Sequence, residues 1–188
     1  IAYAAAVISR RDPEAVMAVF PSDHLISDPD RFTRAISFGI EALKSHPGLL
    51  ITLGMVPDHP ETGYGYIAPG DVMADDGNHR LHRVTAFREK PDADTAQEYI
   101  RRGYLWNAGM FLWRVDTIIE AFRVHLPGMH HLLTNLISRP SISPEDVRGF
   151  YDTVDAVSID YGVMEKATEA GVIPAEFGWS DIGSWDAL

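Results

Sequence analysis

The chain has 188 residues, of which 46% are hydrophobic and 23% are charged, and its formal net charge is −11. This composition is typical of a globular domain, and the length is sufficient for one domain with a substantial core. The negative charge argues against a nucleic-acid partner or an anionic membrane surface, and no apolar run approaches the ~20 residues of a membrane span. Because the chain has no cysteine, disulfides, zinc-thiolate sites and cysteine nucleophiles are excluded, which fits a cytoplasmic protein.

Apolar runs that end in turn residues alternate with amphipathic segments along the first third of the chain. Ile1–Ile8 reads as a helix already under way, with no initiator Met, so we expect that an upstream part is missing. A buried strand is predicted over Ala15–Phe20, and Asp28-Pro29 is typical of a helix start with its cap and first-turn proline. A second buried strand is predicted over Leu49–Met55.

The alternation continues through the rest of the chain. The turn signal Asp75–Asn78 predicts a hairpin between Tyr64–Pro69 and Arg80–Glu89. Leu105–Trp113 is an apolar strand with one polar residue, Asn107. Further helical segments and a last strand follow the same pattern: Asp92–Arg102, Val115–Leu126, Met129–Ser138, the helix opened by Ser143, Tyr161–Thr168 and the strand Val172–Phe177. We therefore predict a single α/β domain over residues 1–188, with a mostly parallel sheet flanked by helices.

Polar or charged residues stand where several of these strands end, namely Asp23, Glu89 with Lys90, Asn107 and Asp181. In open α/β sheets, ligands bind beyond the carboxyl ends of the strands, so these side chains are expected to converge on one cleft. Each also has an ordinary structural interpretation: the aspartates as turn or cap residues, Glu89 in an ion pair, Lys90 solvated, and Asn107 in a turn or bulge.

Six motifs occur in order along nearly the whole chain: Phe20–His24, Thr62–Ile67, Phe87–Pro91, Trp106–Phe111, Ser158–Lys166 and Gly178–Trp185. Together they resemble the mannose-1-phosphate guanylyltransferase (GDP-mannose pyrophosphorylase) family, including the bacterial form fused to a phosphomannose isomerase. The resemblance implies a Rossmann-like sugar nucleotidyltransferase fold and Mg²⁺-dependent conversion of GTP and mannose 1-phosphate to GDP-mannose and pyrophosphate. In that reaction two anions must approach each other, so positioning and charge neutralisation carry most of the catalysis.

The family pattern also implies roles for particular residues. Asp23 and Asp181 would hold Mg²⁺, which prefers hard carboxylate oxygens, and Lys90 would contact the sugar phosphate as a point charge. Glu89 would accept hydrogens from sugar hydroxyls, and Asn107 would bind the sugar through both ends of its amide.

Three residues of the second motif complete the predicted substrate site. Gly63 and Gly65 would allow the backbone to approach the sugar closely, and a plain turn is the alternative. Tyr66 would stack on the sugar or hydrogen-bond to it, and core packing is the alternative. The fifth motif carries Asp160 and Lys166, for which a helix cap and a surface charge are the simplest interpretations.

One part of the family pattern has no counterpart in this sequence: the first strand of the sheet and the glycine-rich loop that grips the triphosphate. We therefore expect the chain to retain the sugar-phosphate half of the site and to be inactive alone. Two alternatives stay open, a related nucleotidyltransferase of the glucose type and a non-catalytic regulatory homologue. The choice of base and self-association into a homo-oligomer are also left open.

Overall fold

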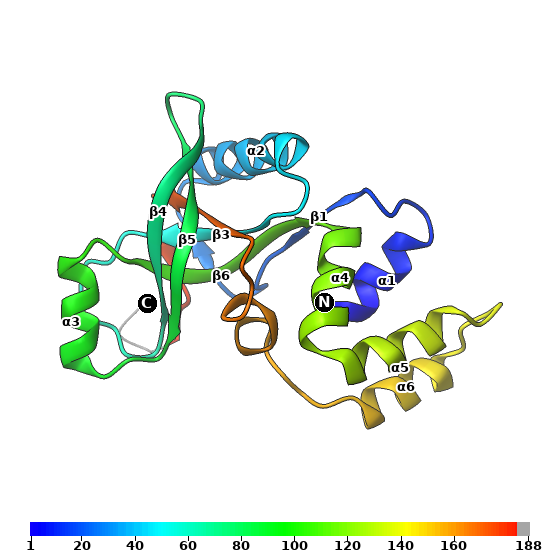
Figure 1. Cartoon of the computed structure of the whole chain (residues 1–188). Helices are drawn as coiled ribbons and strands as arrows, with labels where there is room; N and C mark the ends of the chain where they lie inside the picture. Colours follow the sequence, from blue (N-terminus) through cyan, green and yellow to red (C-terminus); the bar gives the residue numbers. More distant parts are fainter. Residues whose placement is uncertain (184–188) are drawn as a thin grey trace.

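A six-stranded sheet forms the centre of the protein, in the order β1-β6-β3-β7-β5-β4 (Figure 1). Its strands are β1 (Val16–Val19), β3 (Leu50–Met55), β4 (Gly65–Asp75), β5 (Arg80–Glu89), β6 (Leu105–Arg114) and β7 (Ala170–Ala175). The computed structural model describes residues 1–183, so Ser184 and Trp185 at the end of the sixth motif lie outside the described residues.

The α/β class is confirmed, but the sheet is mixed rather than mostly parallel. Within residues 1–183, β3 and β7 are the parallel pair. β6 runs antiparallel to β1, β3 and β4, and β5 runs antiparallel to β4 and β7. The short turn between β4 and β5 allows only antiparallel pairing. The direction of β6 depends on which strands it pairs with, and the apolar pattern of a buried strand does not encode that choice.

Helices cover both faces of the sheet, as predicted. Side chains that alternate along each strand separate into two core clusters, one packed against α2 (Pro29–Ser45) and the other against α1 (Ala2–Ser9) and α4 (Val115–His125). In β6, Met110 and Leu112 face the first cluster, whereas Phe111 and Trp113 face the second. The cap prediction is confirmed at α2, where the Asp28 side chain accepts from the backbone N–H of Arg31 at 2.9 Å.

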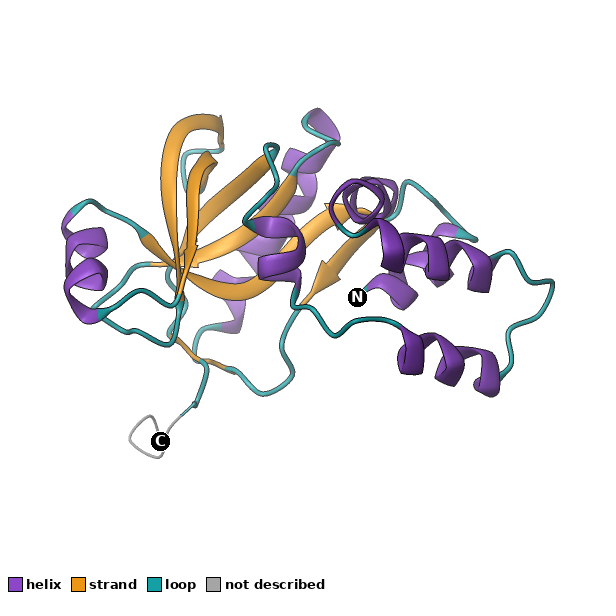
Figure 2. Ribbon diagram, turned by 60° about the horizontal axis from the view of Figure 1, so that its bottom comes forward, coloured by secondary structure: helices purple, strands orange, loops and turns teal. Residues whose placement is uncertain are grey.

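The remaining helices lie at the margins of the molecule. α3 (Ala93–Arg101) follows β5, while α5 (Pro127–Ile137) and α6 (Pro144–Thr153) pack beside α1 and extend away from the sheet (Figures 1 and 2). The segment predicted over Tyr161–Thr168 is instead a five-residue π-helical turn, η1 (Asp160–Met164). None of the described helices is both long and apolar enough to cross a membrane.

A second, two-stranded ribbon joins the first and last motifs, and the sequence pattern did not predict it. β2 (Leu25–Ile26) pairs antiparallel with β8 (Trp179–Ser180), with Leu25 opposite Ser180. The indole Nε1 of Trp179 donates to His24 Nδ1 at 3.0 Å. Because Asp23 precedes Leu25 and Asp181 follows Ser180, the antiparallel pairing brings these two residues to the same end of the ribbon.

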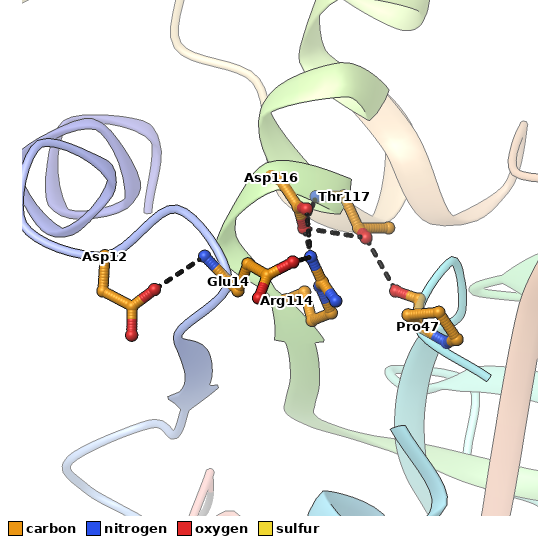
Figure 3. Close-up of polar contacts among 6 residues, drawn as sticks. All are labelled: Asp12, Glu14, Pro47, Arg114, Asp116 and Thr117. Atoms are coloured by element: carbon orange, nitrogen blue, oxygen red, sulfur yellow. Dashed lines mark hydrogen bonds and ion pairs between the residues drawn. The ribbon is translucent and has the colours of Figure 1, made fainter. Parts of the chain in front are cut away.

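Paired charges fix the junction between β6 and α4 (Figure 3). Arg114 Nη2 donates to Glu14 Oε1 at 2.9 Å and to Asp116 Oδ2 at 2.5 Å. Thr117 Oγ1 donates to the carbonyl of Pro47 at 2.8 Å, which ties the start of α4 to the loop after α2. We call Glu14, Arg114, Asp116 and Thr117 the Arg114 junction. The hydrogen bonds that the Arg114 guanidinium donates to Asp116 and then to Glu14 raise its pKa, so the group stays charged.

Candidate functional site

A cavity of about 430 Å³ lies at the start of β4 and the end of β5, against the inner residues of β6 and beside the β2–β8 ribbon. All six sequence motifs contribute to its wall, although they are spread over nearly the whole chain. One lining residue from each motif is, in chain order, Pro21, Gly65, Glu89, Asn107, Asp160 and Asp181. The expected convergence on one cleft therefore holds for Glu89, Asn107 and Asp181, although Asn107 lies within β6 rather than at a strand end.

Gly65 makes room for the Glu89 carboxylate. The two residues face each other across the β4–β5 pair. A Cβ atom at position 65 would lie 2.1 Å from Glu89 Oε1 and 3.2 Å from the Cβ of Asn107, so any side chain there would displace Glu89. The glycine thus permits a close approach, here of a neighbouring side chain to the β4 backbone.

Asn107 connects this carboxylate to a second one. Its Nδ2 donates to Asp160 Oδ1 at 2.8 Å, and its Oδ1 accepts from the backbone N–H of Gly109 at 3.2 Å. The hydroxyl of Thr52, a buried residue of β3, lies 3.2 Å from the same oxygen. We call Glu89, Asn107 and Asp160 the acid cluster.

The acid cluster holds its negative charge in a partly buried setting. Burial, reinforced by the charge of Asp160, raises the pKa of Glu89 to about 7. Burial also raises the pKa of Asp160. The charge of Lys90 acts in the opposite direction on both carboxyls. Perturbed carboxyls of this kind, gathered in a cavity, are typical of functional sites.

Asp181 also lines the cavity, directly after β8. Its Oδ1 accepts from the hydroxyl of Tyr64 at 2.7 Å and from the backbone N–H of Gly183 at 3.0 Å. Burial, together with the bond to Asp181, raises the pKa of Tyr64, so its hydroxyl stays a donor. Asp23 is exposed and is not part of the cavity wall, although both Pro21 and His24 are.

The carboxylates of Asp23 and Asp181 have the donor chemistry for Mg²⁺. No cluster of three or more His, Asp or Glu side chains in residues 1–183 is arranged to hold a metal. Mg²⁺ is commonly bound by one or two carboxylates, with substrate phosphates and water completing its octahedron. The two carboxylates therefore have the chemistry of an Mg²⁺ site that a phosphorylated substrate completes, although only Asp181 lines the cavity.

The other predicted site residues are placed differently. Lys90 is exposed just after β5, outside the cavity wall, with a φ of 49° that non-glycine residues rarely adopt. Gly63 lines the cavity, and its N–H donates to Glu61 Oε1 at 2.7 Å. Tyr66 is fully buried, and its hydroxyl donates to the carbonyl of Glu61 at 2.9 Å. Because alternate residues of a strand face opposite sides, Tyr66 points away from the cavity that Gly65 lines, and packing is its role.

Sequence reasoning missed three side chains at this site: Asp160, Tyr64 and Trp179. Asp160 and Tyr64 lie within two of the six motifs. Their carboxyl and phenol groups could have marked them as candidate site residues. Trp179 lines the cavity and donates a hydrogen bond to His24. Thr52 carried no signal, because a threonine within a buried strand is ordinary.

Comparison with known proteins gives relatives that match along the whole chain. The chain is 38% identical, over its full length, to the mannose-1-phosphate guanylyltransferases of Escherichia coli (strain K12) and Salmonella montevideo. It is also 38% identical, again over its full length, to the xanthan biosynthesis protein XanB of Xanthomonas campestris pv. campestris (strain B100). The chain spans about 40% of the length of these relatives.

Solved structures give the same picture. A Thermus thermophilus protein described as a mannose-1-phosphate geranyltransferase matches with a TM-score of 0.86 and 37% identity, over 100% of this chain and 53% of that one. A Helicobacter pylori protein described as a mannose-6-phosphate isomerase matches with a TM-score of 0.74 and 25% identity, over 94% and 68% of the two chains. The family model for nucleotidyl transferases matches residues 1–188. The chain therefore belongs to the nucleotidyl transferase family.

Proposed function

We propose that this chain forms the sugar-phosphate side of an enzyme that converts GTP and α-D-mannose 1-phosphate to GDP-mannose and pyrophosphate. The observation that carries the proposal is that all six motifs, from Phe20–His24 to Gly178–Trp185, contribute to the wall of one cavity. The relatives that match along the whole chain are named mannose-1-phosphate guanylyltransferases, which supports the same reaction.

In this proposal the acid cluster binds the sugar. Glu89 is ionised above its pKa of about 7 and then accepts hydrogens from sugar hydroxyls. Asn107, held between Asp160 and the N–H of Gly109, keeps the sugar side of the cavity in one arrangement. A fixed geometry favours the reaction, because a displacement requires the attacking oxygen and the phosphorus to be held in line.

The phosphates lie toward Asp181 and the end of the β2–β8 ribbon. Asp181 and Asp23 would hold Mg²⁺, which supplies neutralisation of phosphate charge when bound. Tyr64 holds the Asp181 carboxylate in place through its 2.7 Å hydrogen bond. Lys90 lies at the end of β5, next to Glu89, and its charge would attract the sugar phosphate toward the cavity.

We further propose that the 188-residue chain binds mannose 1-phosphate but does not turn over alone. The sequence contains no glycine-rich basic loop for the triphosphate, and the chain spans about 40% of the length of its guanylyltransferase relatives. A cytoplasmic location and a homo-oligomer stay predictions.

Product analysis tests the proposal directly. The natural gene product that contains this chain would be incubated with GTP, ATP or UTP and with mannose 1-phosphate or glucose 1-phosphate, with and without Mg²⁺. We expect GDP-mannose and pyrophosphate from GTP and mannose 1-phosphate, only with Mg²⁺, and no product from the 188-residue chain. Preference for glucose 1-phosphate or for another nucleotide would contradict the proposed substrate pair, and full activity of the short chain would contradict its dependence on further sequence.

A further inference from the structure

The orientation of the Asn107 amide is fixed by two groups with opposite hydrogen-bonding character. The N–H of Gly109 can only donate, and it lies 3.2 Å from Asn107 Oδ1. An ionised Asp160 carboxylate can only accept, and its Oδ1 lies 2.8 Å from Asn107 Nδ2. Rotating the amide by half a turn would place donor against donor and acceptor against acceptor. The hydroxyl of Thr52 is compatible with either orientation, so it does not decide between them.

The fold is built to bring Asp160 to this position. Asp160 begins the π-helical turn η1, whose last three residues Gly162, Val163 and Met164 are buried. A Cβ atom at Gly162 would lie 3.0 Å from Leu126 Cδ1, so the turn is packed closely against the end of α4. π-Helical turns are rare and occur frequently at functional sites. Here the turn directs a carboxylate into the cavity that also contains Glu89.

Neither acid of the cluster is neutralised by an ion pair. The salt bridges found within residues 1–183 leave out both Glu89 and Asp160. Asp160 accepts from the neutral Asn107 amide, which leaves its second oxygen for another donor. Two carboxylates at one cavity wall suit a ligand that has several hydroxyl groups.

We infer that Asp160 is a positioning residue of the sugar site: by holding the Asn107 amide, it sets the arrangement in which Glu89 meets the sugar hydroxyls. This inference rests on the proposed function for the identity of the ligand. The contact between Asp160 and Asn107 does not depend on it.

The pKa of Glu89 distinguishes a positioning role of Asp160 from a purely structural one, because the charge of Asp160 acts on it directly. Burial is the main cause of the raised Glu89 pKa, and the charge of Asp160 is the next cause. Glu165 raises this pKa as well, whereas Lys90 and the Asn107 amide lower it. Removing the charge of Asp160, with its shape kept, should therefore move the titration of Glu89 to lower pH.

The experiment compares Asp160→Asn and Asp160→Ala with the wild-type gene product. Asp152→Asn serves as the matched control, because it removes an exposed carboxylate from α6. Carbon-13 NMR of selectively labelled glutamate follows the Glu89 carboxyl, with Glu89→Gln identifying its signal. Calorimetry measures mannose 1-phosphate affinity at pH 8 and pH 6. Wild type and variants are compared at each pH, since the ligand's own phosphate titrates near pH ~6.

We expect Asp160→Asn to titrate Glu89 at lower pH than wild type and to lose less affinity between pH 8 and pH 6. At pH 8 this variant should bind within about threefold of wild type, because an asparagine oxygen can still accept from Asn107. Asp160→Ala should bind about tenfold more weakly, the loss expected for one charge-assisted hydrogen bond. Asp152→Asn should match wild type in both measurements.

An unchanged Glu89 titration in Asp160→Asn, or wild-type affinity in Asp160→Ala, would overturn the inference. Should Asp160→Ala fail to fold, the isosteric asparagine variant still decides it through the NMR titration. A wild-type protein that does not bind mannose 1-phosphate would contradict the proposed function instead, and the titration of Glu89 would continue to test the role of Asp160.

Discussion

The Arg114 junction and the acid cluster each place two carboxylates beside one polar side chain, yet they differ in charge balance. At the junction, one guanidinium lies between Glu14 and Asp116, with N···O distances of 2.9 Å and 2.5 Å. In the acid cluster, Glu89 and Asp160 flank a neutral amide, and burial raises the pKa of both. The junction is complete within the chain, whereas the acid cluster is left with acceptors that a ligand can use. The comparison teaches that an uncompensated charge marks function better than the number of charges does.

The largest expected effect comes from filling the space beside Glu89. Gly65→Ala would place a Cβ atom 2.1 Å from Glu89 Oε1, so the carboxylate must move. We expect kcat/KM for mannose 1-phosphate to fall about 100-fold, the scale of loss caused by a ~1 Å misplacement. Steady-state kinetics of the gene product measure it. Gly48→Ala, where a Cβ atom would meet nothing within 4 Å, should leave the kinetics unchanged.

The next largest effect is expected where Tyr64 contacts Asp181. Tyr64→Phe removes the donor that holds Asp181 Oδ1 at 2.7 Å. Loss of a hydrogen bond to a charged group should raise the Mg²⁺ concentration for half-maximal activity about tenfold. A Mg²⁺ titration of the initial rate measures this change. Tyr151→Phe, on the exposed face of α6, is the control. An equal change in both variants would show that Tyr64 has no specific role in Mg²⁺ binding.

The acid cluster should also lower stability at neutral and alkaline pH. Because the folded-state pKa of Glu89, about 7, is above the ordinary value of 4.5, the folded protein binds this proton more tightly than the unfolded chain. This contribution to stability is present below pH ~4.5 and is lost as the pH rises through about 7. Glu89→Gln should therefore raise the unfolding free energy by about 1–2 kcal/mol at pH 8. This figure is the free energy of the pKa shift, reduced because Glu89 is partly exposed.

Urea unfolding at two pH values measures that change. Near pH 4 the Glu89 carboxyl is protonated in the folded protein and mostly protonated in the unfolded chain, so glutamine and glutamate should give nearly equal stability there. A variant that is less stable than wild type at pH 8 would show that Glu89 is compensated in the fold, as the carboxylates of the Arg114 junction are.

The smallest effect is expected at the Arg114 junction. Arg114→Met should lower the thermal unfolding midpoint by a few degrees at low salt and by less at high salt, because exposed ion pairs are weak and screened. Calorimetric unfolding at two ionic strengths measures it. Mannose 1-phosphate affinity should not change, since none of the four junction residues lines the cavity.

Much of the fold followed from the sequence because its signals are local. The proline after the Asp28 cap, the turn at Asp75–Asn78 and the apolar strand around Asn107 all predict elements that the structure contains. The sheet topology did not follow, since the antiparallel direction of β6 is set by its partners. The two-residue strands of the β2–β8 ribbon are too short to give a periodic pattern.

The site was predictable to the extent that its residues stand at strand ends. Glu89 ends β5 at the cavity, whereas Asn107 lies inside β6, so its strand-end position was not confirmed. Tyr66 was not distinguished from Gly65 in the sequence, although strand alternation turns it into the core. Asp160 was missed because its position depends on a π-helical turn and on packing against the end of α4, neither of which has a sequence signature.

The acid cluster, unlike the Arg114 junction, is proposed to bind the sugar ring of mannose 1-phosphate. Calorimetric titration of mannose 1-phosphate at pH 8 into wild type, Glu89→Gln and Arg114→Met tests it most directly. The account predicts that binding is weakened at least about tenfold in Glu89→Gln, the equivalent of one charge-assisted hydrogen bond, and is unchanged in Arg114→Met. Equal affinity in all three proteins, or a loss confined to Arg114→Met, would contradict it.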